Sequence, residues 1–264
     1  MNHDVALIGF GEAGETFALA AGWEDRAAAF DIRAERRSAV AEAGLFAAPD
    51  AASALSHAPL ILSLVTADQA VAVARDYAPH LAPGALWCDM NSVAPETKRA
   101  AAQAVRAAGS HYVDVAVLAP VNPARLAVPL LVAGPVADKA RDALSQAGFT
   151  NISPVGDEIG RASAIKMIRS VMVKGIEALT DEMMAAAQAA GVVDEVLASL
   201  DASEKRIGWT ERAAYNRERM TTHGLRRAAE MEESARTLTD LGVEPVMTNG
   251  TVRRQRDAAG KGEA

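Results

Sequence analysis

The first half of the chain alternates short apolar runs with amphipathic stretches. The runs have the length of buried strands, and the stretches between them have helical spacing. The predicted strands cover residues 5–8, 27–30, 60–65, 85–89, 112–117, 129–134 and 151–154, and the predicted helices cover 15–21, 68–77, 95–108 and 135–146. This βαβ succession predicts an α/β fold class, with a Rossmann-type, doubly wound parallel sheet.

The pattern changes after Gly156, because helical spacing then continues and no further strand pattern follows. The predicted helices cover residues 159–190, 192–205, 210–219 and 222–241, and the charged segment 253–264 is expected to fray. The sequence therefore predicts a sheet domain over residues 1–157 and an all-helical second domain over residues 158–264, begun by a long interdomain helix.

The long helix combines an apolar surface with a stripe of polar groups. At about 100° per residue, Lys166, Ser170 and Glu177 fall within one stripe, with Lys174 at its edge. An ammonium group there must be paired, lose its charge or face a cleft, so Lys166 is a functional candidate. The alternative is a lysine that extends to solvent. Lys174 and Glu177, spaced i, i+3, are interpreted as a buried ion pair.

A glycine-rich segment, Gly9-Phe-Gly-Glu-Ala-Gly14, follows the first predicted strand and leads into a helix. In that context G-x-G-x-x-G binds a dinucleotide: the glycines admit the pyrophosphate to the backbone, and the helix N-terminus stabilises its charge. Asp31 ends the second strand, where a carboxylate accepts hydrogen bonds from a ribose. A purely structural glycine turn is the alternative. The residues expected to bind the cofactor are Gly9, Phe10, Gly11, Glu12, Ala13, Gly14, Asp31, Arg33, Val65, Thr66 and Asn91.

The choice between NAD and NADP depends on the residues that follow the second strand. Asp31 favours NAD, whereas Arg33, Arg36 and Arg37 could hold a 2′-phosphate or form a solvated helix start. Both cofactors stay open, with NAD slightly favoured.

Composition excludes several classes of partner. The chain has 264 residues, is 50% hydrophobic and carries a formal net charge of -7, and it has no basic patch of the kind that binds nucleic acid. No apolar run reaches the roughly 18 residues that span a bilayer. One cysteine, Cys88, excludes an internal disulfide framework, and no histidine or carboxylate spacing predicts a metal site. We expect a cytoplasmic protein with no nucleic-acid or membrane partner.

These features together resemble the β-hydroxyacid dehydrogenase superfamily, the relatives of 6-phosphogluconate and 3-hydroxyisobutyrate dehydrogenases. The resemblance covers nearly the whole chain. Its residues are the glycine segment, Asp89-Met-Asn-Ser-Val-Ala-Pro95, Val113-Asp-Val-Ala-Val117, Gly160 and Lys166. The segment 166–179 is similar to one in a bacterial subgroup with a distinct C-terminal helical domain. The resemblance implies an NAD(P)-dependent oxidoreductase whose second domain binds substrate and dimerises.

The resemblance also implies roles for single residues. Lys166 would be the general acid for carbonyl reduction and the base for alcohol oxidation. Ser170 stands where the family usually has an asparagine that orients the substrate, and it would assist with a shorter reach. Leu118-Ala-Pro120 replaces the serine-glycine-glycine that grips a substrate carboxylate, and proline has no N–H. We therefore expect a secondary alcohol or its carbonyl, hydroxyacid-like or less polar.

The predicted substrate-binding residues are Asn91, Ser92, Leu118, His223 and Arg226. His223 and Arg226 share a helix face, which a solvated salt-bridged surface would also explain. In 6-phosphogluconate dehydrogenases, which the chain resembles, such residues reach the substrate from the partner subunit. The long helix and the other apolar positions of the second domain need a partner to cover them, so we expect a homodimer formed through the C-terminal domain, the residues after Gly160. Two other functions stay open: an imine reductase or reductive aminase, and a catalytically inactive nucleotide-sensing or scaffold protein.

Overall fold

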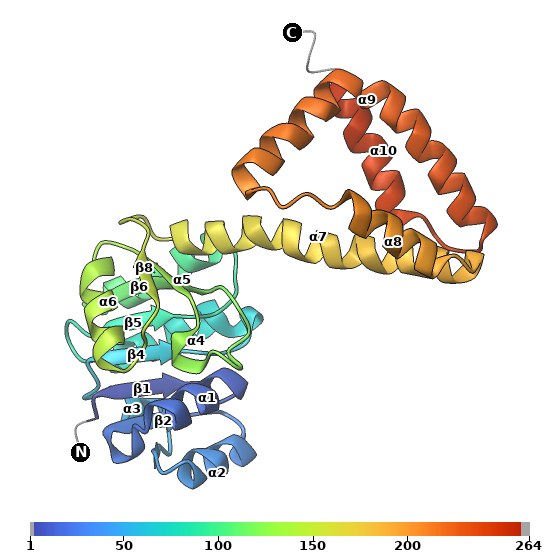
Figure 1. The fold of residues 1–264 in the computed structure, drawn as a ribbon. Helices are drawn as coiled ribbons and strands as arrows, with labels where there is room; N and C mark the ends of the chain where they lie inside the picture. The colour runs from blue at the N-terminus through green and yellow to red at the C-terminus, as the bar shows by residue number, and fades with distance from the viewer. Residues whose placement is uncertain (1–2, 260–264) are drawn as a thin grey trace. The chain divides into compact units, whose positions relative to one another are not determined.

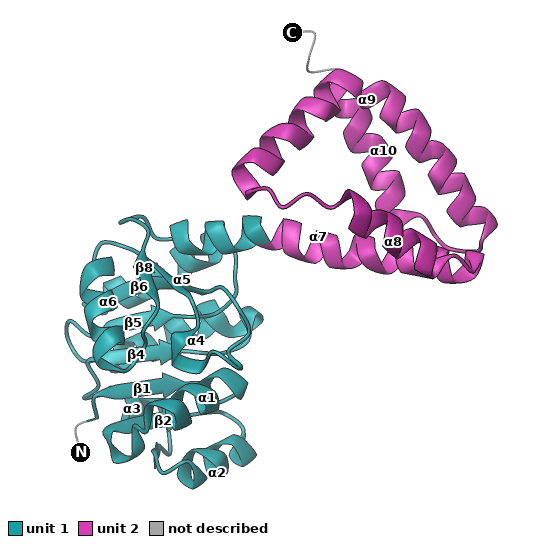
Figure 2. Ribbon diagram, viewed as in Figure 1, with its two compact units in different colours: residues 1–169 teal, residues 170–264 magenta. Residues whose placement is uncertain are grey.

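The computed structural model describes residues 3–259. The chain divides into two compact units, Met1–Arg169 and Ser170–Ala264 (Figure 2). The division falls inside helix α7 (Arg161–Ala190), whereas the boundary expected between residues 157 and 158 precedes this helix. The first turns of α7 belong to unit 1 because Ala162 is fully buried and packs with Ala116 and Ala133.

Unit 1 is organised around a sheet with eight strands in the described residues, in the order β3-β2-β1-β4-β5-β6-β7-β8 (Figure 1). The first six strands in sequence are parallel, in the order of a Rossmann fold. β7 is antiparallel to β6, and β8 is parallel to β7. The sheet is therefore mostly parallel, whereas the prediction was a sheet that is parallel throughout. The strands are β1 (Val5–Ile8), β2 (Ala27–Phe30), β3 (Phe46–Ala47), β4 (Leu60–Ser63), β5 (Leu86–Asp89), β6 (His111–Val117), β7 (Leu130–Ala133) and β8 (Ile152–Pro154).

Both faces of this sheet are covered, which explains why its strands read as continuous apolar runs. Leu7 packs in one buried cluster, and its neighbours Ala6 and Ile8 pack in the other. The sequence prediction missed β3 and α3, because two strand residues and a five-residue helix give little periodic signal, and it gave the start of α2 only as an alternative role for Arg33, Arg36 and Arg37. The helices are α1 (Glu12–Ala21), α2 (Ala34–Glu42), α3 (Ala51–Leu55), α4 (Ala70–Tyr77), α5 (Pro95–Ala107) and α6 (Ala137–Gln146), with 3-10 turns at Glu24–Arg26, Ala67–Gln69, Ala78–His80 and Arg125–Ala127.

Unit 2 is helical, as predicted. It contains the rest of α7, then α8 (Val193–Ser203), α9 (Trp209–Asp240) and α10 (Val246–Ala259). α9 and α10 lie side by side (Figure 1). They approach closely at Gly224, where a Cβ atom would lie 2.4 Å from the carbonyl oxygen of Gln255.

Two predictions for unit 2 are wrong. The two helices predicted at 210–219 and 222–241 form one continuous helix, α9, because neither glycine nor proline separates them. The segment 253–264, expected to fray, is helical as far as Ala259, and residues 260–264 lie outside the described residues. Val252 and Gln255 are buried there, so packing overrides the polar composition of the segment.

The side chain of Glu182 on α7 holds the start of α10. Its carboxylate accepts hydrogen bonds from the backbone N–H groups of Met247 (2.6 Å) and Thr248 (2.9 Å) and from the Thr248 hydroxyl (2.6 Å). These are donors that the first turn of a helix leaves without partners. Burial acts to raise the pKa of this carboxyl, but the hydrogen bonds from Thr248, Met247 and Val246 outweigh it and hold the pKa below its usual value.

α7 exposes many apolar side chains in the single chain. They are Ile165, Ile168, Val171, Met172, Val173, Ile176 and Leu179, with exposed fractions between 38% and 75%. Lys174 and Glu177 are also exposed, so their interpretation as a buried ion pair is wrong. No helix within residues 3–259 is long and apolar enough to cross a membrane.

Candidate active site

The loop between β1 and α1 is shaped by its glycines. Gly9 has a φ of 90°, and a Cβ atom on it would lie 2.5 Å from the carbonyl oxygen of Leu64. A Cβ atom on Gly14 would lie 3.0 Å from the carbonyl oxygen of Gly9. Gly11 precedes the first residue of α1, and open space surrounds the position of its missing Cβ. The loop therefore leaves room for a ligand beside the N-terminus of α1.

Asp31, directly after β2, is buried and holds this loop in place. One carboxylate oxygen accepts the N–H of Phe10 at 2.9 Å, and the other accepts the N–H of Arg33 at 2.9 Å. Each carboxylate oxygen has a second lone pair, so Asp31 can still accept a hydrogen bond from a ribose hydroxyl.

The three arginines after Asp31 have different roles. Arg36 donates to the carbonyl oxygen of Phe10 at 2.5 Å and pairs with Glu15 at 2.7 Å. Arg37 donates to the carbonyl oxygens of Asp31 and Ile32. Arg33 is 56% exposed, and its Nε lies 3.5 Å from Asp31. Arg36 therefore supports the glycine loop and Arg37 the turn after β2, which leaves Arg33 as the arginine placed to meet a cofactor.

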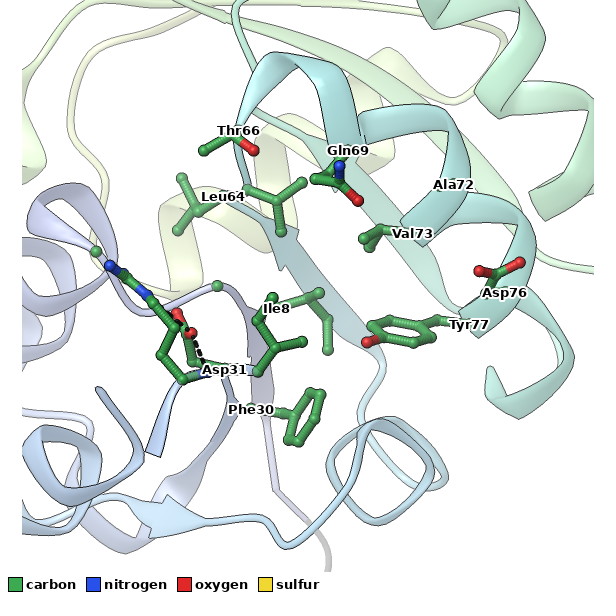
Figure 3. Close-up of a pocket in the computed structure, with 15 residues that line it drawn as sticks. Ile8, Phe30, Asp31, Leu64, Thr66, Gln69, Ala72, Val73, Asp76 and Tyr77 are labelled. Atoms are coloured by element: carbon green, nitrogen blue, oxygen red, sulfur yellow. Dashed lines mark hydrogen bonds and ion pairs between the residues drawn. The ribbon is translucent and has the colours of Figure 1, made fainter. Parts of the chain in front are cut away.

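A pocket of about 480 Å³ lies at the carboxyl ends of β1, β2 and β4 (Figure 3). Six of the residues predicted to bind the cofactor line it: Gly9, Gly11, Asp31, Arg33, Val65 and Thr66. Sequence reasoning missed Phe30 and Tyr77, whose rings lie 6.2 Å apart at one end of the pocket. No spacing rule connects a residue of β2 with one of α4, so only the fold brings them together.

The other five predicted cofactor residues are not among those that line this pocket: Phe10, Glu12, Ala13, Gly14 and Asn91. Phe10 is fully buried, Ala13 is half-buried against the core, and Glu12 is exposed as the first residue of α1. Asn91 is buried, and its side-chain amide donates to Ser63 Oγ at 3.1 Å. Among the described residues, Asn91 Oδ1 accepts no hydrogen bond.

Lys166 reaches the carboxyl edge of the same sheet. Its Nζ donates a hydrogen bond to Ser92 Oγ, three residues after the end of β5. Ser92 is exposed, whereas Lys166 is half-buried. The predicted acid-base lysine and a predicted substrate residue are thus in contact.

Arg169 is a candidate that sequence reasoning missed. It lies three residues after Lys166, a spacing that places both side chains on one helix face. Its guanidinium donates to the carbonyl oxygen of Leu118 at 3.2 Å, just after β6. A charged donor therefore lies where Leu118 offers no hydroxyl group, and the i, i+3 spacing was the signal that could have revealed it.

The remaining predicted site residues belong to unit 2. Ser170 is half-buried, and His223 and Arg226 are exposed on α9. Arg226 pairs with Glu230 at 3.4 Å, and both side chains are largely exposed, which is the salt-bridged surface considered as the alternative. The assignment of His223 and Arg226 to the substrate site stays a prediction.

The grouping of potential metal ligands and the state of the single cysteine complete the description of this region. Within residues 3–259, no group of three or more histidine, cysteine, aspartate and glutamate side chains could hold a metal ion. Cys88 is fully buried, and burial, with the charge of Asp89, raises the pKa of its thiol to about 12. Such a thiol is not reactive near neutral pH.

Comparison with known proteins agrees with the geometry of unit 1. Residues 4–156 match the NAD binding domain of 6-phosphogluconate dehydrogenase, and residues 187–258 match a domain of unknown function, DUF1932. A conserved hypothetical protein from Sinorhizobium meliloti 1021 is 37% identical; the match covers 98% of this chain and 89% of that one, with a TM-score of 0.66.

Two further structures share the fold. The conserved protein MTH1747, described as structurally similar to 3-hydroxyacid dehydrogenases, is 28% identical over 98% of this chain and 99% of its own, with a TM-score of 0.64. A Streptomyces aurantiacus imine reductase is 22% identical over 98% of this chain and 95% of its own, with a TM-score of 0.78. At that identity the likeness shows the fold alone. The chain belongs to the 6-phosphogluconate dehydrogenase-like family of NAD(P)-binding proteins within the β-hydroxyacid dehydrogenase superfamily, and it carries a DUF1932 domain after its Rossmann domain.

Proposed function

We propose that the protein is an NAD(P)-dependent oxidoreductase that interconverts a secondary alcohol and its carbonyl, with Lys166 as general acid and base. One observation carries this proposal: Lys166 bonds to Ser92 at the carboxyl edge of the sheet whose glycine loop and Asp31 line the pocket. Ligands of doubly wound sheets bind at this edge. NAD(P), when bound, supplies the hydride for reduction and accepts it for oxidation.

The residues of the chain divide the work between binding and proton transfer. The N–H groups at the start of α1 would hold the pyrophosphate, and Asp31 would accept from a ribose hydroxyl. The ammonium of Lys166 would give its proton to the substrate oxygen as the carbon is reduced, and the neutral amine would take it back in oxidation. Ser92 would fix the direction of the ammonium, and the Ser170 hydroxyl would assist one turn later.

Arg169 supports an anionic substrate. A guanidinium beside Leu118 can bind a carboxylate with two parallel hydrogen bonds, which replaces the donors that Leu118-Ala-Pro120 lacks. The test is turnover of a panel in which each hydroxy acid is paired with its neutral methyl ester. Faster turnover of the acids supports this substrate class, and faster turnover of the esters contradicts it.

The same panel tests the other two functions. Reduction of cyclic imines in preference to every carbonyl compound would support an imine reductase, whose fold the chain shares. Cofactor binding without turnover of any compound would support a nucleotide-sensing or scaffold protein. The hydrogen bond between Lys166 and Ser92 favours the first proposal, because it holds a proton donor at the carboxyl edge of the sheet, where carbonyl reduction needs one.

We propose that NAD is preferred over NADP, because the buried carboxylate of Asp31 would repel a 2′-phosphate. NAD should then raise the melting temperature more than NADP does at equal concentration. Asp31→Asn should weaken NAD binding by about tenfold, since a hydrogen bond to a charged group is lost. Asp76→Asn is the control, because Asp76 lines the same pocket but is exposed beside Arg75. Tighter binding of NADP by the wild type would contradict the proposal.

We also propose a homodimer formed through unit 2. The exposed apolar side chains of α7, such as Val171 at 75% and Ile176 at 47%, support it, because burying them removes apolar surface from water. Light scattering at micromolar concentration should give about twice the 27.6 kDa mass of the chain. Val171→Glu should shift the mass toward the monomer. The matched variant Leu19→Glu alters an exposed leucine of α1 and should leave the mass unchanged, and a monomeric wild type would refute the dimer.

A further inference from the structure

Three charged side chains form a buried bridge outside the cofactor pocket. Lys98 of α5, Asp89 of β5 and Asp114 of β6 are all 0% exposed. The Lys98 Nζ lies 2.9 Å from Asp89 Oδ1, 2.6 Å from the Asp89 carbonyl oxygen and 3.6 Å from Asp114 Oδ1. Asp89 and Asp114 are direct partners in the β5–β6 register. Full burial of three charges is costly unless each is paired, so their arrangement is confined to one geometry.

One arm of the Asp89–Lys98–Asp114 bridge holds the loop after β5. Asp89 Oδ1 accepts the N–H of Asn91 at 2.9 Å, and Asp89 Oδ2 accepts the hydroxyl of Tyr112 at 2.6 Å. Ser92 follows Asn91 directly, so this arm fixes the residue to which Lys166 donates its hydrogen bond.

The other arm holds the start of α7. Asp114 Oδ2 accepts the N–H of Gly160 at 3.1 Å, the N–H of Ser163 at 3.0 Å and the Ser163 hydroxyl at 3.2 Å. The carboxylate satisfies the first donors of the helix and complements its dipole. Lys166 lies one turn further along. The ammonium of Lys98 therefore joins the loop that carries Ser92 to the helix that carries Lys166.

We propose that this bridge positions Lys166 for proton transfer, with Asp114 and Lys98 as positioning residues. This inference rests on the proposed function. An apolar contact alone, such as that of Ala162 in the same turn, lacks direction and would let α7 rotate or slide. Three hydrogen bonds to a single carboxylate oxygen, one from Gly160 just before the helix and two from Ser163 in its first turn, oppose such a movement. Among the described residues, Asp114 Oδ1 accepts no hydrogen bond, and the Lys98 ammonium lies 3.6 Å from it. Both Asp89 and Asp114 therefore depend on the positive charge of Lys98.

The test compares two buried carboxylates that hold helix starts. Asp114→Asn should lower the rate of hydride transfer by about 100-fold, the effect of displacing a reacting group by about 1 Å, with an unchanged KM for the cofactor. Glu182→Gln makes the same chemical change at the start of α10, so it should lower the melting temperature without changing this rate. An equal loss of rate in both variants would show a general effect of stability and overturn the inference.

Three further variants keep the test informative if Asp114→Asn does not fold. Ser163→Ala removes one hydrogen bond to the carboxylate and should lower the rate by about tenfold. Lys98→Met should lower the rate strongly, and Lys98→Arg should restore part of it because the positive charge returns. A normal rate in Ser163→Ala and in both Lys98 variants would overturn the inference.

A second readout does not need turnover. Competitive labelling of lysine amines, followed by mass spectrometry, should show Lys166 about tenfold more reactive in Asp114→Asn or Ser163→Ala than in the wild type, because its bond to Ser92 is lost. Glu182→Gln should leave this labelling unchanged. If the labelling changes as expected and the wild type turns over no substrate, the bridge stands and the proposed function fails. If the wild type turns over substrate but neither labelling nor rate responds, the bridge fails and the function stands.

Discussion

Replacing Lys166 with methionine should lower the rate of hydride transfer by about 10²–10⁴-fold, the usual contribution of a general acid or base. Methionine has a similar length and shape but carries no proton. The substrate oxygen would then have to take its proton from water. The rate is measured in stopped-flow single turnovers by the absorbance of the nicotinamide, and cofactor binding by thermal shift should be unchanged because Lys166 does not line the cofactor pocket.

Lys139→Met is the control for this experiment. Lys139 lies on α6 beside the first residues of β1, β4 and β5, at the opposite edge of the sheet. The same loss of an ammonium group there should not affect hydride transfer. Wild-type hydride transfer in the Lys166 variant would remove the lysine from the mechanism, even if the cofactor still bound.

Alanine at Gly9 and at Gly11 should give two different defects. Gly9→Ala places a Cβ atom 2.5 Å from the Leu64 carbonyl oxygen at a φ of 90°, so unit 1 should lose about 2 kcal/mol of stability or more, together with cofactor binding. Gly11→Ala meets no neighbouring atom within 4 Å, so stability should be retained. Its methyl group would occupy the space beside the α1 N-terminus and weaken cofactor binding by about 10–100-fold.

Urea unfolding and cofactor titration separate these two outcomes. Equal stability of Gly9→Ala and the wild type would mean that the loop adapts to a Cβ atom at that position. Wild-type cofactor affinity in Gly11→Ala would place the pyrophosphate away from the α1 N-terminus and contradict the binding mode proposed for the pocket.

Much of unit 1 could be predicted from the sequence because its information is local. The apolar run of β1, the glycines after it and the acid after β2 follow within 31 residues, and the structure places Gly9, Gly11 and Asp31 around one pocket. Strand direction is not local in this sense. The periodicity of β7 is the same whether it runs parallel or antiparallel to β6, so its reversal could not be predicted.

The parts of the site that were missed depend on contacts between distant residues. Tyr77 of α4 meets the ring of Phe30 of β2 only in the folded chain, and Lys98 joins Asp89 to Asp114 only because of the β5–β6 register. Asp89 ends one apolar run and Asp114 lies inside another. In the sequence each is therefore a single acidic residue without a visible partner. Their common partner, Lys98, lies on a helix and has no spacing relationship to either aspartate.

The reversal of β7 and β8 determines where the chain enters α7. β8 ends level with the middle of β6 and not at the carboxyl edge, and Gly160 then bonds to Asp114 at that level. From Gly160 to Arg169 a helix rises about 13 Å, and from Asp114 to Leu118 a strand advances about 13 Å. The two lengths match, so Arg169 meets Leu118 at the end of β6. One inserted or deleted residue between Gly160 and Lys166 would turn the lysine by about 100° away from Ser92, so the length of this segment matters as much as its composition.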